Sequence, residues 1–151
     1  MAKHVGIDLG TTTSGLAYLR KDGEPEIVPN ADGERLTPSV VFFDPYEDIK
    51  LVGSAARDGG DPGRTVFRIK NWMDDPEYSI DIDGQDWTPT EISALILAKL
   101  KRECSRLIGP IRDVVVTVPA NFNELARKAT TAAAKICGLN VTRLLNEPTA
   151  A

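Results

Sequence analysis

The segment Asp113 to Val118, which contains the run VVVTV, constrains the fold of this chain more than any other feature of its sequence. An unbroken β-branched run predicts a central strand that is buried on both faces, because a half-exposed strand alternates apolar and polar residues. Pro119 ends that strand, a helix is predicted from about Asn123 to Cys137, and Val141 to Leu145 forms a further apolar strand. A strand, a helix and a strand joined by short links form a right-handed parallel crossover.

The first half of the chain predicts antiparallel strands instead. Val5 to Leu9 has apolar residues at alternate positions, and a second strand is expected from Leu16 to Leu19 after a short turn. The Asp22-Gly23 pair marks a tight turn before a third strand at Glu26 to Val28. An antiparallel meander combined with a parallel crossover predicts one mixed sheet and therefore an α/β fold.

The segment between these halves is rich in turn residues and predicts smaller elements. They are strands at Ser39 to Phe43 and Leu51 to Val52, helices at Ala55 to Asp58 and Arg64 to Met73, and strands at Tyr78 to Ile82 and Gln85 to Trp87. The last two strands flank Asp83-Gly84, which is the strongest short hairpin signal in the sequence.

A long amphipathic helix is predicted next. Thr88, Pro89 and Glu91 have the types and spacing of an N-cap, a first-turn proline and a capping box, and Gly109-Pro110 ends the helix. Its predicted apolar stripe consists of Ile92, Leu95, Ile96, Leu100, Cys104 and Leu107. We interpret the cations of another face as a solvated surface rather than a binding patch. These cations are Lys99, Arg102 and Arg106.

The composition is that of an ordinary globular protein, and 151 residues predict one domain with a proper core. The net charge of −4 gives no basic field, so we expect no nucleic-acid partner, although a local basic patch is compatible with it. Cys104 and Cys137 lack metal-ligand spacing and are expected as buried thiols in a reducing cytosol, with a chance disulfide as the alternative. We find no signal peptide, and Lys99 and Lys101 interrupt the most apolar helix, so we expect a cytoplasmic protein without a membrane span.

The turn between the first two strands has the residue types of a phosphate-binding loop. It consists of Gly10, Thr11, Thr12 and Thr13, and Asp8 lies near the end of the strand before it. Glycine lets the backbone bend sharply, and successive N–H groups beside small hydroxyls form a concavity that suits a phosphate. An ordinary β-turn with an acid beside it is the alternative that the spacing leaves open.

Three groups of polar residues follow predicted strands: Asp8 to Thr13, Pro119 to Asn123, and Asn146-Glu147. We expect them at one cleft, because ligands of open α/β sheets lie at the carboxyl ends of the parallel strands. Asp8 and Glu147 would suit metal-assisted phosphoryl transfer, with one holding Mg²⁺ through water and the other orienting or deprotonating an attacking water. Glu147 has a second interpretation, as the first-turn acid of a helix that begins at Pro148.

Lys70 is a candidate cation for such a cleft. On the predicted helix from Arg64 to Met73, it shares a face with Val66, Phe67 and Met73. A lysine among apolar neighbours either extends its amine to solvent along the surface, or reaches an anion in a cleft while its stem is buried.

Four segments, taken in order, resemble the nucleotide-binding domain of the seventy-kilodalton heat-shock chaperone (DnaK-type) family. They are GIDLGTTTS near the start, FRIK around Lys70, VVVTVPANFNELAR, and the terminal LLNEPTAA. The resemblance runs the length of the chain and implies lobe one of an ATPase domain of the actin-like superfamily, with a ribonuclease-H-like sheet. It also implies that approximately residues 39–110 form a peripheral subdomain, trimmed because the chain between Lys70 and Pro119 is shorter than the family norm.

The resemblance implies a role for each candidate residue. Gly10 to Thr13 match the first phosphate loop, and Asp8 matches the carboxylate that holds Mg²⁺ through water. Lys70 matches the lysine that positions the γ-phosphate and the attacking water, and Glu147 matches the acid that assists this water. Beyond the catalytic set, Pro119 and Arg127 match residues that relay nucleotide state, and Arg143 matches a basic residue that engages J-domain cochaperones. One departure is Asn121, which replaces a family aromatic and weakens the packing behind Pro119.

The ligands implied by the resemblance are ATP or ADP with Mg²⁺, and the implied activity of the intact protein is ATP hydrolysis that controls peptide binding and protein folding under stress. Its implied partners are unfolded peptides, J-domain cochaperones and nucleotide-exchange factors. A second phosphate loop, an adenosine pocket and a peptide-binding domain have no counterpart in the sequence, so we expect a fragment that binds nucleotide weakly without turnover. A sugar or acid kinase of the superfamily and a non-enzymatic actin-like scaffold or interaction module are the alternatives.

Overall fold

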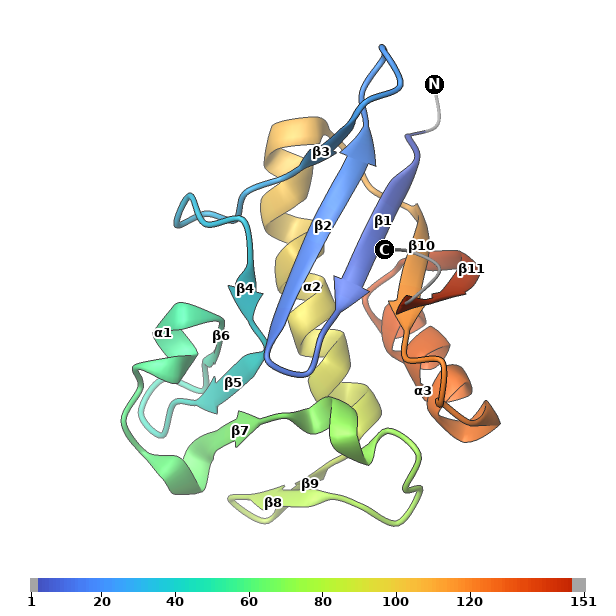
Figure 1. The fold of residues 1–151 in the computed structure, drawn as a ribbon. Helices are drawn as coiled ribbons and strands as arrows, with labels where there is room; N and C mark the ends of the chain where they lie inside the picture. The colour runs from blue at the N-terminus through green and yellow to red at the C-terminus, as the bar shows by residue number, and fades with distance from the viewer. Residues whose placement is uncertain (1–2, 148–151) are drawn as a thin grey trace.

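The main sheet of the molecule has six strands in both orientations. The computed structural model describes residues 3–147, in which these strands are β1 (Val5–Leu9), β2 (Thr13–Leu19), β3 (Pro25–Ile27), β4 (Thr37–Pro38), β10 (Asp113–Val118) and β11 (Asn140–Asn146). Five of them lie in the order β11-β10-β1-β2-β3, and β4 pairs with β2. β2 is antiparallel to β1, β3 and β4, whereas β10 is parallel to β1 and β11. The predicted mixed α/β sheet is therefore confirmed (Figure 1).

Two helices, α2 (Pro89–Ile108) and α3 (Glu124–Ile136), cover one face of this sheet and lie behind the strands in Figure 1. The predicted capping box of α2 is present, because Thr88 and Glu91 each accept a hydrogen bond from the other's backbone N–H. α3 connects β10 to the parallel strand β11, as the crossover pattern predicts. The core between helices and sheet includes Ile7, Leu16, Ile92, Ile96, Leu97, Val114, Val116 and Ala133.

The buried surface of α2 is wider than the predicted stripe. Leu107 was expected in the core and is exposed, whereas the unpredicted Leu97 is fully buried. The expectation that Lys99 is solvated is also wrong, because its amine contacts the buried carboxylate of Glu103 at 2.5 Å. Glu103 in turn accepts a hydrogen bond from the Ala31 N–H, so the loop that carries Ala31 covers this flank of the helix.

The central strand β10 is buried on one face rather than on both. Val114, Val116 and Val118 are each at most 1% exposed, whereas Val115 and Thr117 on the opposite face are partly exposed. The prediction of two-sided burial is therefore wrong for this structure, because α2 and α3 lie on the same side of the sheet. We call the opposite side, which faces the viewer in Figure 1, the open face.

A bulge in β11 decides which of its side chains join the core. The pairing with β10 runs from Val114↔Val141 to Val115↔Arg143, so Thr142 is the extra residue. Its hydroxyl donates to the Val114 carbonyl oxygen. Because a bulge shifts the alternation by one residue, Val141 and Leu144 both pack against the core, and Arg143 falls in register with Val115 of the open face.

The smaller elements lie beyond one end of the main sheet, in the lower part of Figure 1. They are β5 (Val40–Phe43), β6 (Lys50–Val52) and β7 (Thr65–Phe67), the short helix α1 (Ser54–Arg57), the 3-10 helices η1 (Pro62–Arg64) and η2 (Ile69–Trp72), and β8 (Ile80–Ile82) with β9 (Gln85–Trp87). β5 lies between β6 and β7 in an antiparallel sheet. The predicted hairpin of β8 and β9 is confirmed, with Asp83 and Gly84 at positive φ as a tight hairpin turn requires.

The predicted helix from Arg64 to Met73 is wrong. Strand β7 and helix η2 occupy this segment, and Arg68 between them has a φ of 52°, which an α-helix does not allow. Pairing with β5 explains the difference, because the Val66 and Phe67 backbones complete the small sheet beside Val40 and Val41. Lys70 is nevertheless buried, together with Ile69 and Met73.

Neither cysteine forms a disulfide. Cys104 is buried in α2, where desolvation raises the pKa of its thiol to about 11, and the half-buried Cys137 follows α3. Within residues 3–147, every helix is too short or too polar to span a lipid bilayer. The helix expected to begin at Pro148 lies outside the described residues.

Candidate functional site

A polar cavity of about 300 Å³ lies where η2, the turn after β1 and the segment after β10 meet. Its walls bring together residues that are far apart in the sequence: Thr11, Lys70, Asn71, Asp74, Pro119, Asn121, Phe122 and Asn123. Three of the predicted site residues, Thr11, Lys70 and Pro119, therefore face one cavity. Asn121 lies on the same wall, so its amide occupies a place where the resemblance expects an aromatic ring.

The amine of Lys70 is the most specifically held group in this cavity. Its side chain is 7% exposed, and Nζ lies 2.5 Å from Oε1 of Glu147, whose side chain is 41% exposed. The aromatic ring of Phe122 is 5.7 Å from the same nitrogen, at a distance suited to a cation–π contact. Carboxylate and ring thus fix the charged end of a lysine whose stem is buried and which lines the cavity.

The turn after β1 is tightly closed. A Cβ atom added at Gly10 would lie 2.0 Å from the carbonyl oxygen of Thr13, so no other residue fits this backbone. Thr13 already belongs to β2, three residues earlier than the predicted strand, and its partner is Pro38 of β4. Thr11 and Thr12 remain as the outward part of the turn, with Thr12 exposed and Thr11 on the cavity wall.

Asp8 lies near this cavity but does not line it. It is exposed near the end of β1, and its Oδ1 accepts a hydrogen bond from the hydroxyl of Thr117, its register partner on β10. Thr117 therefore orients the carboxylate and leaves Oδ2 available. Asp8 lines a neighbouring hollow of about 400 Å³ on the open face, together with Gly15 and Leu145.

Arg127 connects the segment after β10 to the end of β11. Its guanidinium donates to the carbonyl oxygen of Phe122 at 3.1 Å and to Oδ1 of Asn146 at 2.7 Å. Asn146 is the last residue of β11 and directly precedes Glu147. Arg127 thus links the segment after Pro119, which carries the ring beside Lys70, to the strand that carries the carboxylate beside Lys70.

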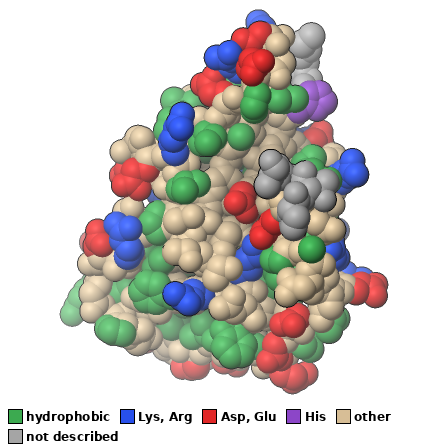
Figure 2. Space-filling model, viewed as in Figure 1, with side chains coloured by type: hydrophobic (Ala, Val, Ile, Leu, Met, Phe, Trp, Pro, Cys, Tyr) green, Lys and Arg blue, Asp and Glu red, His purple; other side chains and the backbone are tan. Residues whose placement is uncertain are grey.

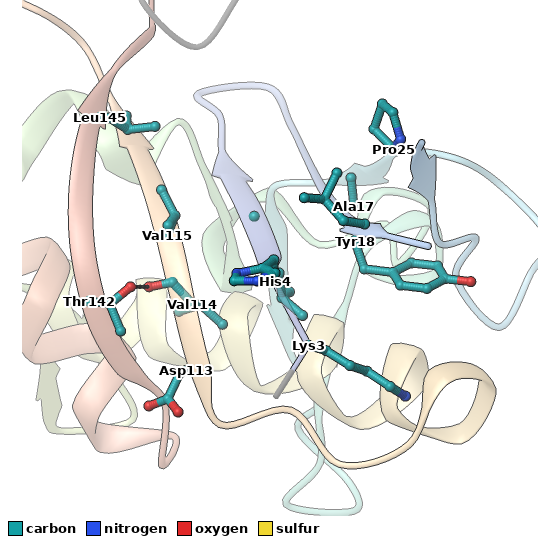
Figure 3. Close-up of a pocket in the computed structure, with 13 residues that line it drawn as sticks. Lys3, His4, Ala17, Tyr18, Pro25, Asp113, Val114, Val115, Thr142 and Leu145 are labelled. Carbon is teal, nitrogen blue, oxygen red and sulfur yellow. Dashed lines mark hydrogen bonds between the residues drawn. The ribbon is translucent and has the colours of Figure 1, made fainter. Parts of the chain in front are cut away.

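Arg143 stands apart from the cavity. It is exposed on β11, in register with Val115 of the open face. This face carries a hollow of about 590 Å³, shown in Figure 3, whose lining includes Ala17, Val115 and Leu145. Figure 2 shows mostly uncharged groups over β2, with acidic groups beside them and further charged side chains along the outline of the molecule. The 590 Å³ hollow is thus mainly apolar, with Lys3, His4 and Asp113 also in its lining, whereas the 300 Å³ cavity holds Lys70.

The side chains near the turn suit a magnesium ion that also binds a phosphate ligand. They suit less well an ion that is held by protein groups alone. Magnesium binds to one or two carboxylates, keeps several waters and shares substrate phosphate oxygens. Asp8 offers one exposed, oriented carboxylate of that kind. No cluster of three or more potential metal-binding side chains occurs within residues 3–147, so a protein-only cage is not built there.

Sequence reasoning did not predict the contacts that position this site. Thr117 orients Asp8, Phe122 flanks Lys70, and Asn146 holds Arg127. Thr117 had a usable signal, as the polar residue within an otherwise apolar run, and the segments with Phe122 and Asn146 were expected at the cleft without a role for either residue. The other two contacts join residues that are 52 and 19 positions apart and follow from the tertiary fold alone.

A model of the Hsp70 protein family matches the chain at residues 4–76 and 71–151. The two matched segments cover almost the entire sequence and include all the candidate residues described above. They overlap at residues 71–76, within the region where the chain is expected to be shorter than the family norm.

Proposed function

This chain belongs to the Hsp70 protein family, its mixed sheet is that of an actin-like ATPase lobe, and on this premise we propose that the lobe binds Mg-ATP and takes part in its hydrolysis. Proteins of this family are chaperone ATPases. The observation that carries the proposal is the buried Lys70 amine, held by Glu147 in the cavity that Thr11 of the turn also lines.

We assign the chemistry to three side chains. Phosphoryl transfer is catalysed by positioning and by stabilisation of charge. Lys70 contributes a fixed positive charge against the γ-phosphate, and Glu147 orients the attacking water and accepts its hydrogen bond. Asp8 would hold Mg²⁺ through water, and the bound ion would supply further neutralisation of phosphate charge. The turn from Gly10 to Thr13 would hold phosphate oxygens with its N–H groups and hydroxyls.

The finer part of the proposal concerns regulation. In the intact protein, ATP hydrolysis would control binding of unfolded peptides, with J-domain cochaperones and exchange factors as partners. Arg127 supports a relay role for the segment after Pro119, because it hydrogen-bonds both to Phe122 and to Asn146. Arg143, exposed on β11, is accessible to a J-domain partner.

For the 151-residue chain alone, we propose weak Mg-ATP binding without useful turnover. The family resemblance implies that phosphate is held between two loops from two lobes, and these residues supply only one of them. Isothermal titration calorimetry tests this directly. Micromolar affinity of the 151-residue chain for Mg-ATP would contradict it.

In the full-length protein, Lys70→Ala is expected to reduce single-turnover ATP hydrolysis by about 10²-fold or more while largely preserving ATP binding. The reason is that the amine stabilises charge that develops in the transition state of phosphoryl transfer. Binding of ATP also depends on the phosphate turn. Single-turnover hydrolysis and equilibrium titration of the same preparation separate the two effects.

Lys99→Ala is the matched control, since Lys99 also forms a buried ion pair with a glutamate, at the same 2.5 Å, but away from the cavity. It should lower thermal stability and leave the hydrolysis rate of the folded protein unchanged. Normal hydrolysis by Lys70→Ala, or an equal loss in Lys99→Ala, would mean that Lys70 serves only to stabilise the fold.

A further inference from the structure

We propose that Ser14 and Ser39 are positioning residues for ATP binding, which hold the turn from Gly10 to Thr13 in its phosphate-binding shape through a buried hydroxyl bridge. The proposal rests on the function proposed above, because it concerns the same site. Neither serine lines the cavity with Lys70, so both act through the turn rather than on the nucleotide.

The bridge joins two buried hydroxyls. Oγ of Ser14 and Oγ of Ser39 are 2.7 Å apart, and the two residues are 0% and 3% exposed. Ser14 also accepts a hydrogen bond from the Gly10 N–H at 3.2 Å. Two hydrogen bonds, one between Ser39 and Ser14 and one from Gly10 to Ser14, therefore connect the segment after β4 to the first residue of the turn.

The same segment holds the turn at two further points. The Ser39 N–H donates to the carbonyl oxygen of Thr12 at 2.8 Å, and Pro38 pairs with Thr13 in the β2·β4 ladder. The segment of Pro38 and Ser39 thus holds Gly10, through Ser14, as well as Thr12 and Thr13. Among residues 3–147, the N–H groups of Thr11 and Thr12 have no protein acceptor and remain available to an anion.

Burial makes the two hydroxyls dependent on each other. Each serine hydroxyl has one proton to donate and can accept, and burial keeps both from the bulk solvent that could replace a lost partner. Removal of one hydroxyl leaves the other with an unmet hydrogen bond, which costs more than the bond itself contributes. The two serines should therefore behave as one unit, and loss of either should loosen the Gly10 N–H.

The test uses Ser14→Ala, Ser39→Ala and the double variant in the full-length protein, with Ser93→Ala as the matched control. Ser93 is also buried, at 1% exposed, but its hydroxyl contacts the sulfur of Met73 instead of the turn. We expect each single variant to weaken Mg-ATP binding by about three- to tenfold, with kcat at saturating ATP nearly unchanged. The double variant should weaken binding no further than either single variant, because both remove one bridge.

Hydrogen exchange of the Gly10 amide provides a second readout that does not need ATP. In the unsubstituted protein this amide should exchange about tenfold or more slowly than those of Thr11 and Thr12, since only it has an acceptor. Ser39→Ala should accelerate it, although Ser39 does not touch Gly10 directly. This measurement also decides the proposal if Ser14→Ala does not fold.

Three outcomes would overturn the bridge: unprotected exchange at Gly10 in the unsubstituted protein, additive losses of affinity in the double variant, or an equal loss in Ser93→Ala. If the unsubstituted full-length protein did not bind Mg-ATP, the proposed function would fail. The exchange measurement would still decide whether Ser39 holds the turn.

Discussion

A methyl group at position 10 would collide with the backbone of its own turn. The nearest atom to an added Cβ is the Thr13 carbonyl oxygen at 2.0 Å, and backbone cannot move aside as a flexible side chain can. Gly10→Ala is therefore expected to reshape the turn and to weaken Mg-ATP binding in the full-length protein by about tenfold or more, with a smaller effect on stability. Titration with Mg-ATP and thermal unfolding of the same samples measure the two effects.

Gly63→Ala is the control for this substitution, because its added Cβ would make only an ordinary contact of 3.4 Å with Asp61. It should leave ATP affinity unchanged. If Gly10→Ala bound Mg-ATP normally, the turn would not be the phosphate site.

The importance of Gly10 could be predicted from the sequence, whereas that of Ser14 and Ser39 could not. Glycine followed by threonines is a local pattern with a local mechanical reason. The serines are 25 positions apart and meet only because β4 pairs with the start of β2. Residues that act through a neighbour in space leave no trace in the spacing of a single sequence.

Helix α2 carries a buried ion pair that should make stability depend on pH. Burial by itself raises the pKa of Glu103, but hydrogen bonds from Lys99 and from the Ala31 N–H outweigh it and hold the pKa below its ordinary value of 4.5. Glu103 is therefore ionised more readily in the folded state than in the unfolded chain. Its stabilising contribution is fully present above pH 4.5 and is lost as the pH falls through the lower folded pKa.

Glu103→Gln is expected to lower the free energy of unfolding at pH 7 by about 1–3 kcal/mol, because a charged hydrogen-bond acceptor is lost from a buried site. The difference from the unsubstituted protein should shrink as the pH falls below 4.5, where the native carboxylate becomes protonated. Urea unfolding at a series of pH values measures this. A difference that stays constant with pH would contradict the role of the ionised carboxylate.

The elements differ in how far the sequence determines them. The capping box fixes the start of α2, and the Asp83-Gly84 turn fixes the β8·β9 hairpin, since both signals are local. The segment from Arg64 to Met73 has a helical spacing of apolar residues, yet its first part pairs with β5. A short segment beside an unpaired strand gains more from backbone hydrogen bonds and burial than from its own helical preference.

The sheet taken as a unit has one covered face and one open face. α2 and α3 bury Val114 and Val116 on one side, while Val115, Thr117 and Leu145 remain partly exposed on the other. The unbroken VVVTV run predicts burial of both faces of β10. Within residues 3–147, only one of these faces is buried. Exposed apolar faces of this kind favour association.

We therefore expect the 151-residue chain to bind a dye for apolar surfaces and to self-associate as its concentration rises. Replacing Val115 and Leu145 together by threonine should reduce both effects, because threonine has the β-branched shape that a strand favours and adds a hydroxyl. Leu125→Gln is the control, since Leu125 is an equally apolar but exposed residue of α3, away from the sheet. Dye fluorescence and light scattering measure the two effects. A chain that stayed monomeric without dye enhancement, or a control that reduced association as much as the double variant, would show that the open face does not drive association.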